Sequence, residues 1–513
     1  MQSTTEAVHV EVSTQAAHFP RPRIAWFLFT ALAVLALAAG IACYLHEHHH
    51  GAIVTGMRTP GYGGASWGLY IVFVVFFIGV SFAGITVAAM ARLFSIEVLA
   101  PVTRIAELMT LVALLAGAAC VVADLGRPLD GLLKLPRYAN PSSPFFGTFT
   151  LVMAGYLFSS LVYFFLAGRN DAARLAEPAR GPLRLFYKGW ASGYRDLPVQ
   201  RERHHRVSFW LALGILPLLI TAHSTLGFVF GIQSGRPGWF SALQAPAFVV
   251  LAGVSGIGML ILVTLGFRWL FRLQVPDATV RWLGNFMWIL AFVYLYFMIV
   301  EELTATYAAP AAERRIAHEI VGGTFAPLFW TTAGGLFLAF FIPFVLFVTK
   351  RTSMGWVALA GLLANVGAVG KRLLIVVPSQ THGALMPIET GTYTPTWVEI
   401  GVVLGLFGFI FLAMLVFGRV FPLVPSGHGH GHGTPLPDEF WRRALTALVV
   451  LAALGLVVIG LSDAFRVFSH GEYDPRIPFA PVIFASGVML LVSSAAVYEL
   501  LPDKHRIDPN QPH

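Results

Sequence analysis

Charged side chains interrupt one of the long apolar runs of this sequence. Lys371 and Arg372 stand next to each other between Gly361 and Pro378. Each charge near the centre of a bilayer costs about 2.5–3.5 kcal/mol on insertion scales, so both residues need partners and are candidates for function. We expect acidic partners, and three acidic residues lie at a compatible depth: Glu301, Glu302 and Glu399.

Two interpretations of Lys371 and Arg372 fit the sequence, and they are compatible. In the first, the two cations form a buried ion pair between helices, which fixes their packing. In the second, they line a polar cavity that binds a quinone head group and exchanges protons with it. In that case Glu301, Glu302 and Glu399 would balance the charge and pass protons.

A single histidine, His223, lies well inside an apolar run, between Leu219 and Ser224. A buried histidine of this kind is either a satisfied core residue or a titratable group that hydrogen-bonds a quinone carbonyl and relays its proton. A b-type haem usually takes two such histidines as axial ligands, so we expect no haem on this chain. The two cysteines, Cys43 and Cys120, are too few for an iron–sulfur cluster or a four-cysteine zinc site.

Two further places carry polar residues near the ends of apolar runs. Asp124 and Arg127 belong to the turn Asp124–Pro128, which is either a helix end closed by an Asp124–Arg127 pair or a lip that meets a partner subunit. Glu107, with Asn285 and Asn365, could extend a proton path across the membrane, or could only hold helices together. We expect no bound metal ion at any of these places.

The elements that position these residues are membrane-spanning helices. The 513 residues are 57% hydrophobic and 12% charged, with a mean hydropathy of +0.72, which excludes a soluble enzyme. Apolar stretches long enough to span a bilayer predict an all-α polytopic membrane protein with twelve helices. They lie near 24–44, 67–92, 105–124, 145–168, 207–231, 246–271, 280–300, 328–349, 353–378, 396–421, 443–462 and 479–500.

Lysine and arginine are concentrated in the connections on the side of the chain termini, including the basic 169–206 connection. Because cytoplasmic loops carry the excess of positive charge, we expect both termini in the cytoplasm. The net charge of +8 then needs no nucleic acid partner. Most candidate residues fall in the outer half of the membrane or at its boundary: Asp124, Arg127, His223, Glu301, Glu302, Lys371, Arg372 and Glu399.

The chain also contains a short internal sequence repeat, here called the echo, and a few linkers. Gly79-Val80-Ser81 and Gly253-Val254-Ser255 each follow a tryptophan in a helix that opens a block of four spans. The histidine-rich stretch Gly427–Gly433 is interpreted as a flexible linker, with metal binding as the alternative. The 169–206 connection is expected along the inner membrane face.

Several segments together resemble the NrfD/PsrC family of integral membrane subunits that interact with quinone, in the long form found in alternative complex III. They cover roughly residues 67–424 and comprise Trp67–Tyr70, Asp124–Pro128, His223-Ser224, Pro237–Trp239, Ala247–Val249, Tyr294–Leu303, Lys371-Arg372 and Gly391–Glu399. No single motif is decisive, but their order and their positions relative to the spans make the joint match specific.

The resemblance implies two tandem four-helix bundles, 67–231 and 246–378, with flanking helices at 24–44 and 396–421. The remaining segments are tails at 1–23 and 501–513, a linker at 422–442 and two extra helices at 443–500. It further implies that the chain sits in the cytoplasmic membrane of a prokaryote. There it would exchange electrons between menaquinone or ubiquinone and an iron–sulfur subunit linked to a molybdopterin or multihaem catalytic subunit.

We combine the resemblance with the position of the polar residues in a hypothesis about their roles. His223, Asp124 and Arg372 would bind the quinone head group and manage its protons, with Tyr70, Arg127 and Lys371 as additional binding groups. Glu107, Glu301, Glu302 and Glu399 would transfer protons.

Two other classes of protein remain as alternatives. A secondary transporter can also have twelve spans and cytoplasmic termini, but transporters commonly bind their substrate near the bilayer midplane, whereas these polar residues gather toward one face. A purely structural anchor for a peripheral enzyme would not need Lys371 and Arg372 inside the membrane, unless they only form an ion pair.

Overall fold

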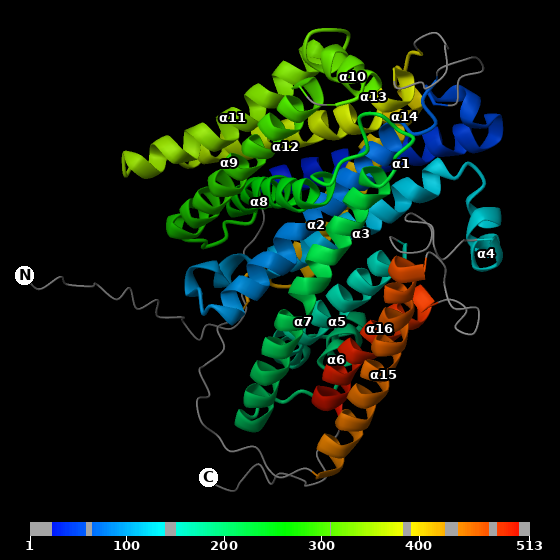
Figure 1. The fold of residues 1–513 in the computed structure, drawn as a ribbon. Helices are drawn as coiled ribbons and strands as arrows, with labels where there is room; N and C mark the ends of the chain where they lie inside the picture. Colours follow the sequence, from blue (N-terminus) through cyan, green and yellow to red (C-terminus); the bar gives the residue numbers. More distant parts are fainter. Residues whose placement is uncertain are drawn as a thin grey trace, which may run out of the picture.

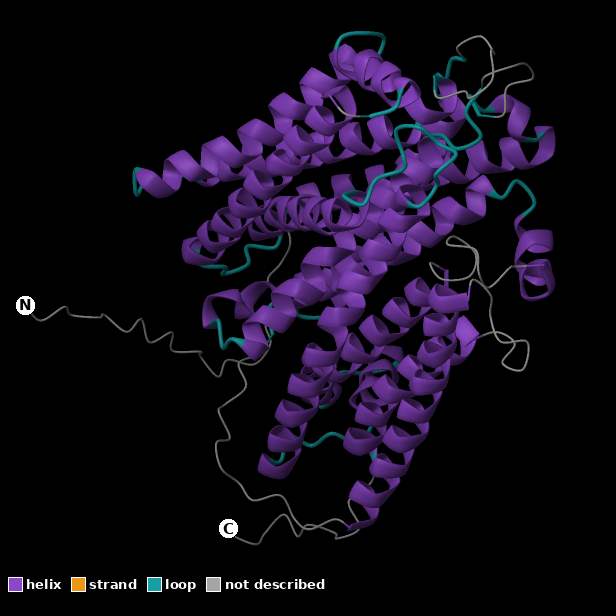
Figure 2. Ribbon diagram, viewed as in Figure 1, coloured by secondary structure: helices purple, strands orange, loops and turns teal. Residues whose placement is uncertain are grey.

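The computed structural model describes residues 23–57, 64–138, 150–307, 309–382, 391–425, 440–470 and 480–501. Every regular element in these residues is helical (Figure 2). Twelve helical segments are long and apolar enough to cross a membrane, which confirms the predicted all-α polytopic membrane protein. Most of the predicted tails 1–23 and 501–513 and of the linker 422–442 lies outside the described residues.

Eight long helices form two sets whose members contact one another in a ring. The first set comprises α2 (Leu69–Leu93), α3 (Thr103–Asp124), α5 (Thr150–Ala176) and α7 (Pro198–Gly231). The second comprises α8 (Gln244–Leu270), α9 (Asp277–Tyr307), α11 (Ala326–Val348) and α12 (Met354–Val376). Helix α2 joins the sets, because it packs against α3 and α7 on one side and against α8 and α12 on the other.

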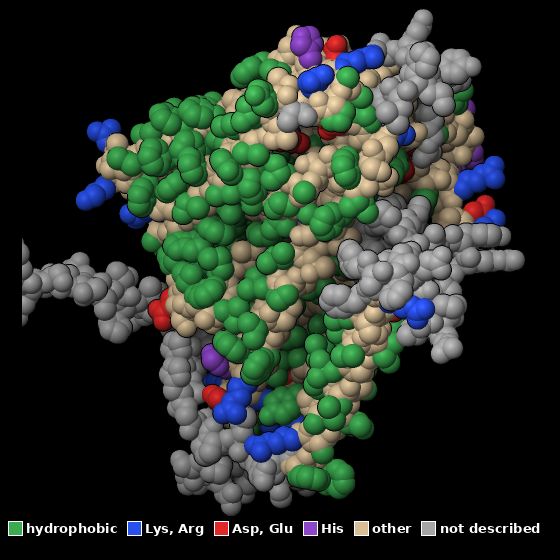
Figure 3. Space-filling view, in the orientation of Figure 1, with side chains coloured by type: hydrophobic (Ala, Val, Ile, Leu, Met, Phe, Trp, Pro, Cys, Tyr) green, Lys and Arg blue, Asp and Glu red, His purple; other side chains and the backbone are tan. Residues whose placement is uncertain are grey.

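Helix α2 is the most enclosed part of the molecule. Every residue from Leu69 to Ala89 is buried, and the helix is apolar on all sides, as expected for a helix surrounded by others. Helices farther from the centre instead expose large apolar side chains, such as Phe292 and Ile299 on α9. Figure 3 shows hydrophobic side chains spread over the flank of the long helices and lysines and arginines toward their ends, as expected for a surface in contact with lipid.

Two helix pairs flank the two sets. Helix α1 (Ala25–His50) pairs with α14 (Trp397–Val420), and α14 packs on α3 and α2. Helix α15 (Phe440–His470) pairs with α16 (Ala480–Leu500), which packs on α5 and α7 (Figure 1). The first pair is very close: a Cβ on Gly40 would lie 2.4 Å from the Cα of Gly405. Small residues at such crossings let membrane helices approach through their backbones.

Short helices mark the two ends of the bundle. The α10 end carries α4 (Pro128–Tyr138), α10 (Ala311–Val321) and α13 (Pro378–Thr381). The opposite end, here called the α6 end, carries α6 (Pro182–Ala191) and the turn between α11 and α12 (Figure 1). In the predicted orientation the α10 end faces outward.

The 169–206 connection is shorter than predicted. Helix α5 continues to Ala176 and α7 begins at Pro198, so the two helices take up much of this segment. Arg169, Asp171 and His204 are buried rather than spread on a membrane surface. The reason is charge pairing within the bundle, because Arg169 forms an ion pair with Glu499 of α16 and Asp171 forms one with Arg104 of α3.

Candidate functional site

Helix α12 places Arg372 in the middle of the bundle, where only 2% of the residue is exposed. Its Nη1 donates to the Ala368 carbonyl oxygen at 3.0 Å, and its Nη2 donates to Ser255 Oγ at 3.3 Å. Its buried Nε has no hydrogen-bond partner. Within the part of the chain that the structure describes, no carboxylate lies within ion-pair distance of Arg372, contrary to the expectation of an acidic partner.

Space for the Arg372 guanidinium comes from a glycine of α2. A Cβ added to Gly79 would lie 2.3 Å from Arg372 Nη2, so any side chain at this position would displace the cation. The guanidinium also lies over the ring of Phe76, 5.6 Å from its centroid. Three helices, α2, α8 and α12, therefore meet at this one cation.

The two copies of the Gly-Val-Ser echo face each other at this crossing. A Cβ on Gly79 would lie 3.3 Å from Ser255 Oγ, and a Cβ on Gly253 would lie 3.3 Å from the ring of Phe82. Ser255 of the second copy is the side chain that holds Arg372 Nη2. The short repeat in the sequence thus marks the contact between the two helix sets.

His223 reaches the same stretch of α2 from the other side. Its Nδ1 is 2.8 Å from the Leu219 carbonyl oxygen and its Nε2 is 3.0 Å from the Ile78 carbonyl oxygen. Because a neutral imidazole has one N–H, only one of these contacts can be a hydrogen bond until the ring takes up a second proton. Ile78 precedes Gly79, so His223 and Arg372 contact consecutive residues of α2.

Two side chains that were not predicted from the sequence, Tyr156 and Thr110, complete this region. The Ser81 carbonyl oxygen accepts hydrogen bonds from Tyr156 at 3.1 Å and from Thr110 at 2.7 Å. Both hydroxyls are buried, on α5 and α3. The signal that could have found this region is the echo itself, since it contains Ser81 and Ser255. We call the group formed by Ser81, Tyr156, His223, Ser255 and Arg372 the central cluster.

Lys371 points away from the central cluster toward α9. Its Nζ lies 2.6 Å from Glu301 Oε2, and Gln244 donates to the other oxygen of Glu301 at 3.4 Å. The Lys371 side chain is buried, whereas that of Glu301 is 26% exposed. Glu302 follows on the same helix and is half-buried. This pair therefore connects the interior of the second helix set with its surface.

Tyr70 and Glu399 belong to a separate group near the α10 end. Tyr70 donates to Glu47 Oε2 at 2.5 Å, and Tyr393 donates to Glu399 Oε1 at 2.7 Å. The other oxygen of Glu399 accepts from the backbone amides of Gly56 and Thr396. The expectation that Glu399 balances Lys371 or Arg372 was wrong, because its carboxylate closes the first turn of α14 and holds a loop.

Two members of this α10-end group, Glu47 and Tyr393, were not predicted. Tyr393 lies outside the spans, and burial, reinforced by the nearby Glu399 carboxylate, raises the pKa of its phenol. The phenol therefore stays protonated and acts as a donor. Asp124, half-buried at the end of α3, interacts electrostatically with Tyr393.

The predicted pair of Asp124 with Arg127 does not form. Arg127 is exposed beyond the end of α3, and its side chain makes no ion pair with the described residues. Within those same residues, no hydrogen bond or ion pair joins Asp124 to His223 or Arg372. Asp124 and Tyr70 therefore belong to the group near the α10 end, apart from His223 and Arg372 in the central cluster.

Glu107 lies near the opposite end, in a buried charge network. Its Oε1 is 3.7 Å from Arg92 Nη2, and neither of its oxygens has a hydrogen-bond partner. Further ion pairs join Arg104 to Asp171 at 2.9 Å and Arg169 to Glu499 at 2.8 Å, and His204 Nδ1 lies 3.1 Å from the same Glu499 oxygen. We call this group the α6-end network: Arg92, Arg104, Glu107, Arg169, Asp171, His204 and Glu499.

Among the described residues, no group of three or more histidine, cysteine, aspartate or glutamate side chains is arranged to hold a metal ion. A small cavity of about 20 Å³ lies between α2, α3, α8 and α14, lined by residues that include Phe76 and Phe407. Phe76 is the ring that contacts the Arg372 guanidinium. An aromatic, apolar space thus adjoins the central cluster.

Comparison with known proteins agrees with this architecture. A putative dimethyl sulfoxide reductase membrane subunit of Halobacterium salinarum is 30% identical over 414 residues, which cover 76% of this chain and 89% of the relative. A selenate reductase subunit of Mesobacillus selenatarsenatis is 25% identical over 412 residues, covering 77% and 93%. An Hdr-like menaquinol oxidoreductase integral membrane subunit of Archaeoglobus fulgidus is 25% identical over 418 residues, covering 79% and 95%.

The family model described as polysulphide reductase, NrfD, matches residues 58–384. This range includes both helix sets, the central cluster and the Lys371–Glu301 pair. Because the match extends over more than half of the chain, the protein belongs to the NrfD (polysulphide reductase) family of membrane proteins.

Proposed function

We propose that this chain is the quinone-reactive membrane subunit of a respiratory oxidoreductase complex, and that the central cluster is where the quinone head group reacts. The names of its relatives support the first part, since all three are subunits of reductases or oxidoreductases, one of them for menaquinol. The buried Arg372 supports the second. The quinone is a menaquinone or a ubiquinone.

The single observation that carries the proposal is the buried Arg372 guanidinium, which has no carboxylate partner among the described residues. Helix packing does not require such a cation, and a charge left uncompensated in the interior is costly. A quinone supplies what Arg372 lacks, because its carbonyl oxygens accept hydrogen bonds and become more negative on reduction. The free Nε–H of Arg372 is then a donor for one of these oxygens.

The groups around Arg372 would handle the protons. Oxidation of a quinol releases two electrons and two protons, and the electrons leave for a redox centre on a partner subunit. His223 would accept one of these protons. A second N–H on its ring would turn both of its carbonyl contacts into hydrogen bonds. Lys371, Glu301 and Glu302 would form the route from the cluster toward the surface.

The remaining candidates take roles away from the reacting atoms. Asp124, Tyr70 and Arg127 would shape the approach from the α10 end, where an iron–sulfur subunit docks and connects to a molybdopterin or multihaem catalytic subunit. Glu399 would act through Tyr393 in the same region. Glu107 would take part in proton movement at the α6 end. In this proposal the protein lies in a prokaryotic cytoplasmic membrane with both termini in the cytoplasm.

The test is purification from the native membrane in mild detergent, with mass spectrometry of co-purifying chains and an assay of quinol oxidation and quinone reduction. We expect redox subunits and quinone-linked turnover. His223→Ala should abolish the turnover while the complex still assembles. The matched control is Thr225→Ala on the same helix, which removes a hydroxyl that bonds only to the Thr221 carbonyl oxygen.

Two outcomes would contradict the proposal. Full turnover in His223→Ala would show that His223 takes no part in the quinone reaction. A lone, redox-silent chain, from a preparation that keeps other membrane complexes intact, would refute the subunit role and favour a transporter.

A further inference from the structure

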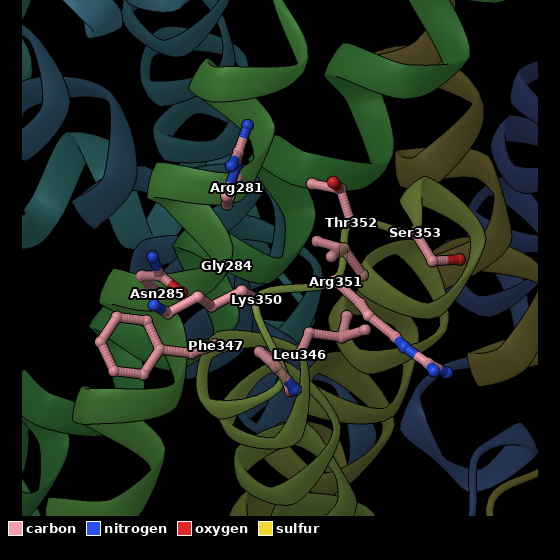
Figure 4. A pocket seen from close by; sticks show the side chains of 11 residues that line it. Arg281, Gly284, Asn285, Leu346, Phe347, Lys350, Arg351, Thr352 and Ser353 are labelled. Atoms are coloured by element: carbon pink, nitrogen blue, oxygen red, sulfur yellow. The ribbon is translucent and has the colours of Figure 1, made fainter.

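A pocket of about 320 Å³ opens at the α6 end of the second helix set, far from the central cluster. It lies where α9 begins, α11 ends and the turn 349–353 leads into α12. Figure 4 shows Lys350 directed toward Asn285, with Arg281 and Arg351 on different sides of the pocket. Hydroxyl groups of Thr352 and Ser353 complete its polar lining.

The three cations of this pocket are unbalanced. Within the part of the chain that the structure describes, no acidic residue lines the pocket, and no side-chain ion pair or hydrogen bond involves Arg281, Lys350 or Arg351. In the neighbouring connection, by contrast, Arg268 forms an ion pair with Asp277. Like charges around one cavity repel each other, and an anion bound between them would relieve this repulsion.

The start of α12 adds to the positive potential of the pocket. No side chain caps this helix at Ser353, so the first amide groups of α12 have no side-chain acceptor there. Such amides carry the positive end of the helix dipole. This contribution supports the three cations and does not by itself define a site.

The rest of the lining is apolar and continues onto the outer surface of the bundle. Pro343, Leu346 and Val357 form the inner wall, and Phe347 is 56% exposed at its edge. A soluble anion would gain nothing from this wall. A molecule with an anionic head and an apolar chain would match both halves of the lining.

We propose that this pocket binds the head group of an anionic glycerophospholipid, with an acyl chain lying along α11. Basic pockets between membrane helices are suited to such head groups, particularly at the cytoplasmic surface, where the predicted topology places this end. The bound lipid would hold α9, α11 and α12 together at their ends. Helix α12 also carries Lys371 and Arg372, although the lipid site does not depend on their function.

The test uses the full-length chain purified with its co-purifying subunits and freed of lipid by detergent exchange. Binding of phosphatidylglycerol and of phosphatidylcholine with the same acyl chains is measured by native mass spectrometry and by thermal shift. We expect the unaltered protein to prefer phosphatidylglycerol. Lys350→Gln with Arg351→Gln should weaken phosphatidylglycerol binding about 25-fold, because each basic residue near an anionic lipid strengthens binding by a factor of about five.

The matched control is Arg272→Gln with Arg419→Gln. Both arginines are exposed at the same end and neither lines the pocket, so the double substitution removes the same charge elsewhere. We expect it to leave phosphatidylglycerol binding nearly unchanged. Melting temperatures without lipid show whether both variants are folded.

Three results would overturn the proposal. The first is unchanged phosphatidylglycerol binding in the Lys350/Arg351 variant. The second is an equal loss in the control, which would mean that general surface charge attracts the lipid. The third is glycerol 3-phosphate binding as tightly as the lipid, which would make the pocket a site for a free anion.

Discussion

The central cluster and the α6-end network both bury arginines among membrane helices, but they treat the charge differently. In the network, Arg104 lies against Asp171 and Arg169 lies against Glu499. In the central cluster, Arg372 has a serine hydroxyl and a backbone carbonyl as partners. The difference separates a charge that holds helices together from a charge that is available to a ligand.

The location of each group agrees with this distinction. The α6-end network joins α3 to α5, and α16 to α5 and α7, so it fastens helices that pack around the first set. The central cluster lies where the two helix sets meet, and the missing side chain of Gly79 makes room there for the guanidinium. Substitutions in the two groups should therefore affect different properties.

The largest effect is expected in the α6-end network. Arg104→Gln removes the buried ion pair with Asp171 and should lower stability by about 3–5 kcal/mol. The measurement is the thermal unfolding of the purified complex. Arg104→Gln combined with Asp171→Asn should recover much of this loss, because neither charge then remains. Unchanged stability in the single variant would show that the network does not fasten the helices.

Arg372→Gln should produce the opposite pattern. It leaves no carboxylate behind, so stability should change little, whereas quinone-linked turnover should fall about 100-fold, a typical loss for a buried donor aimed at developing negative charge. Arg372→Lys should restore little, since an ammonium group cannot reproduce the planar fork of donors. Normal turnover combined with a large drop in melting temperature would assign Arg372 a structural role and break the comparison.

A smaller effect is expected from the glycines of the echo. Gly79→Ala should push the Arg372 guanidinium aside and lower turnover about tenfold, although no titratable group is removed. In Gly253→Ala the new methyl group would meet the end of the flexible Leu290 side chain, 2.7 Å away, which can move. Turnover assays on both variants test the asymmetry. Equal activities would mean that the position of Arg372 is not important.

Much of the architecture was accessible from the sequence. All twelve spans were predicted, because the bilayer imposes a length and an apolar composition that can be counted along the chain. Lys371, Arg372 and His223 were recognised because charged or titratable groups in apolar runs are conspicuous. Their burial followed from the same observation.

The partners of these residues were not accessible in the same way. From their depth in the membrane, Glu301, Glu302 and Glu399 were equally possible ion-pair partners of Lys371. In the structure, Glu301 is the one that pairs with Lys371. Glu399 turned toward a loop, and Tyr70 toward Glu47 on α1, which no pattern in the sequence connects. The burial of Arg169 at the start of the 169–206 segment was not predicted, because its acidic partner is 330 residues away in the chain.

Hydropathy and charge thus specify where a side chain lies along the membrane normal, since this depends only on the chain and the solvent around it. Which side chains meet at a given depth depends on how each helix is rotated and which neighbours it packs against. That information lies in contacts between distant segments, such as Gly79 with Arg372 and Arg169 with Glu499. For this protein, the spans and the buried charges are properties of the sequence, while the unbalanced arginine is a property of the packed bundle.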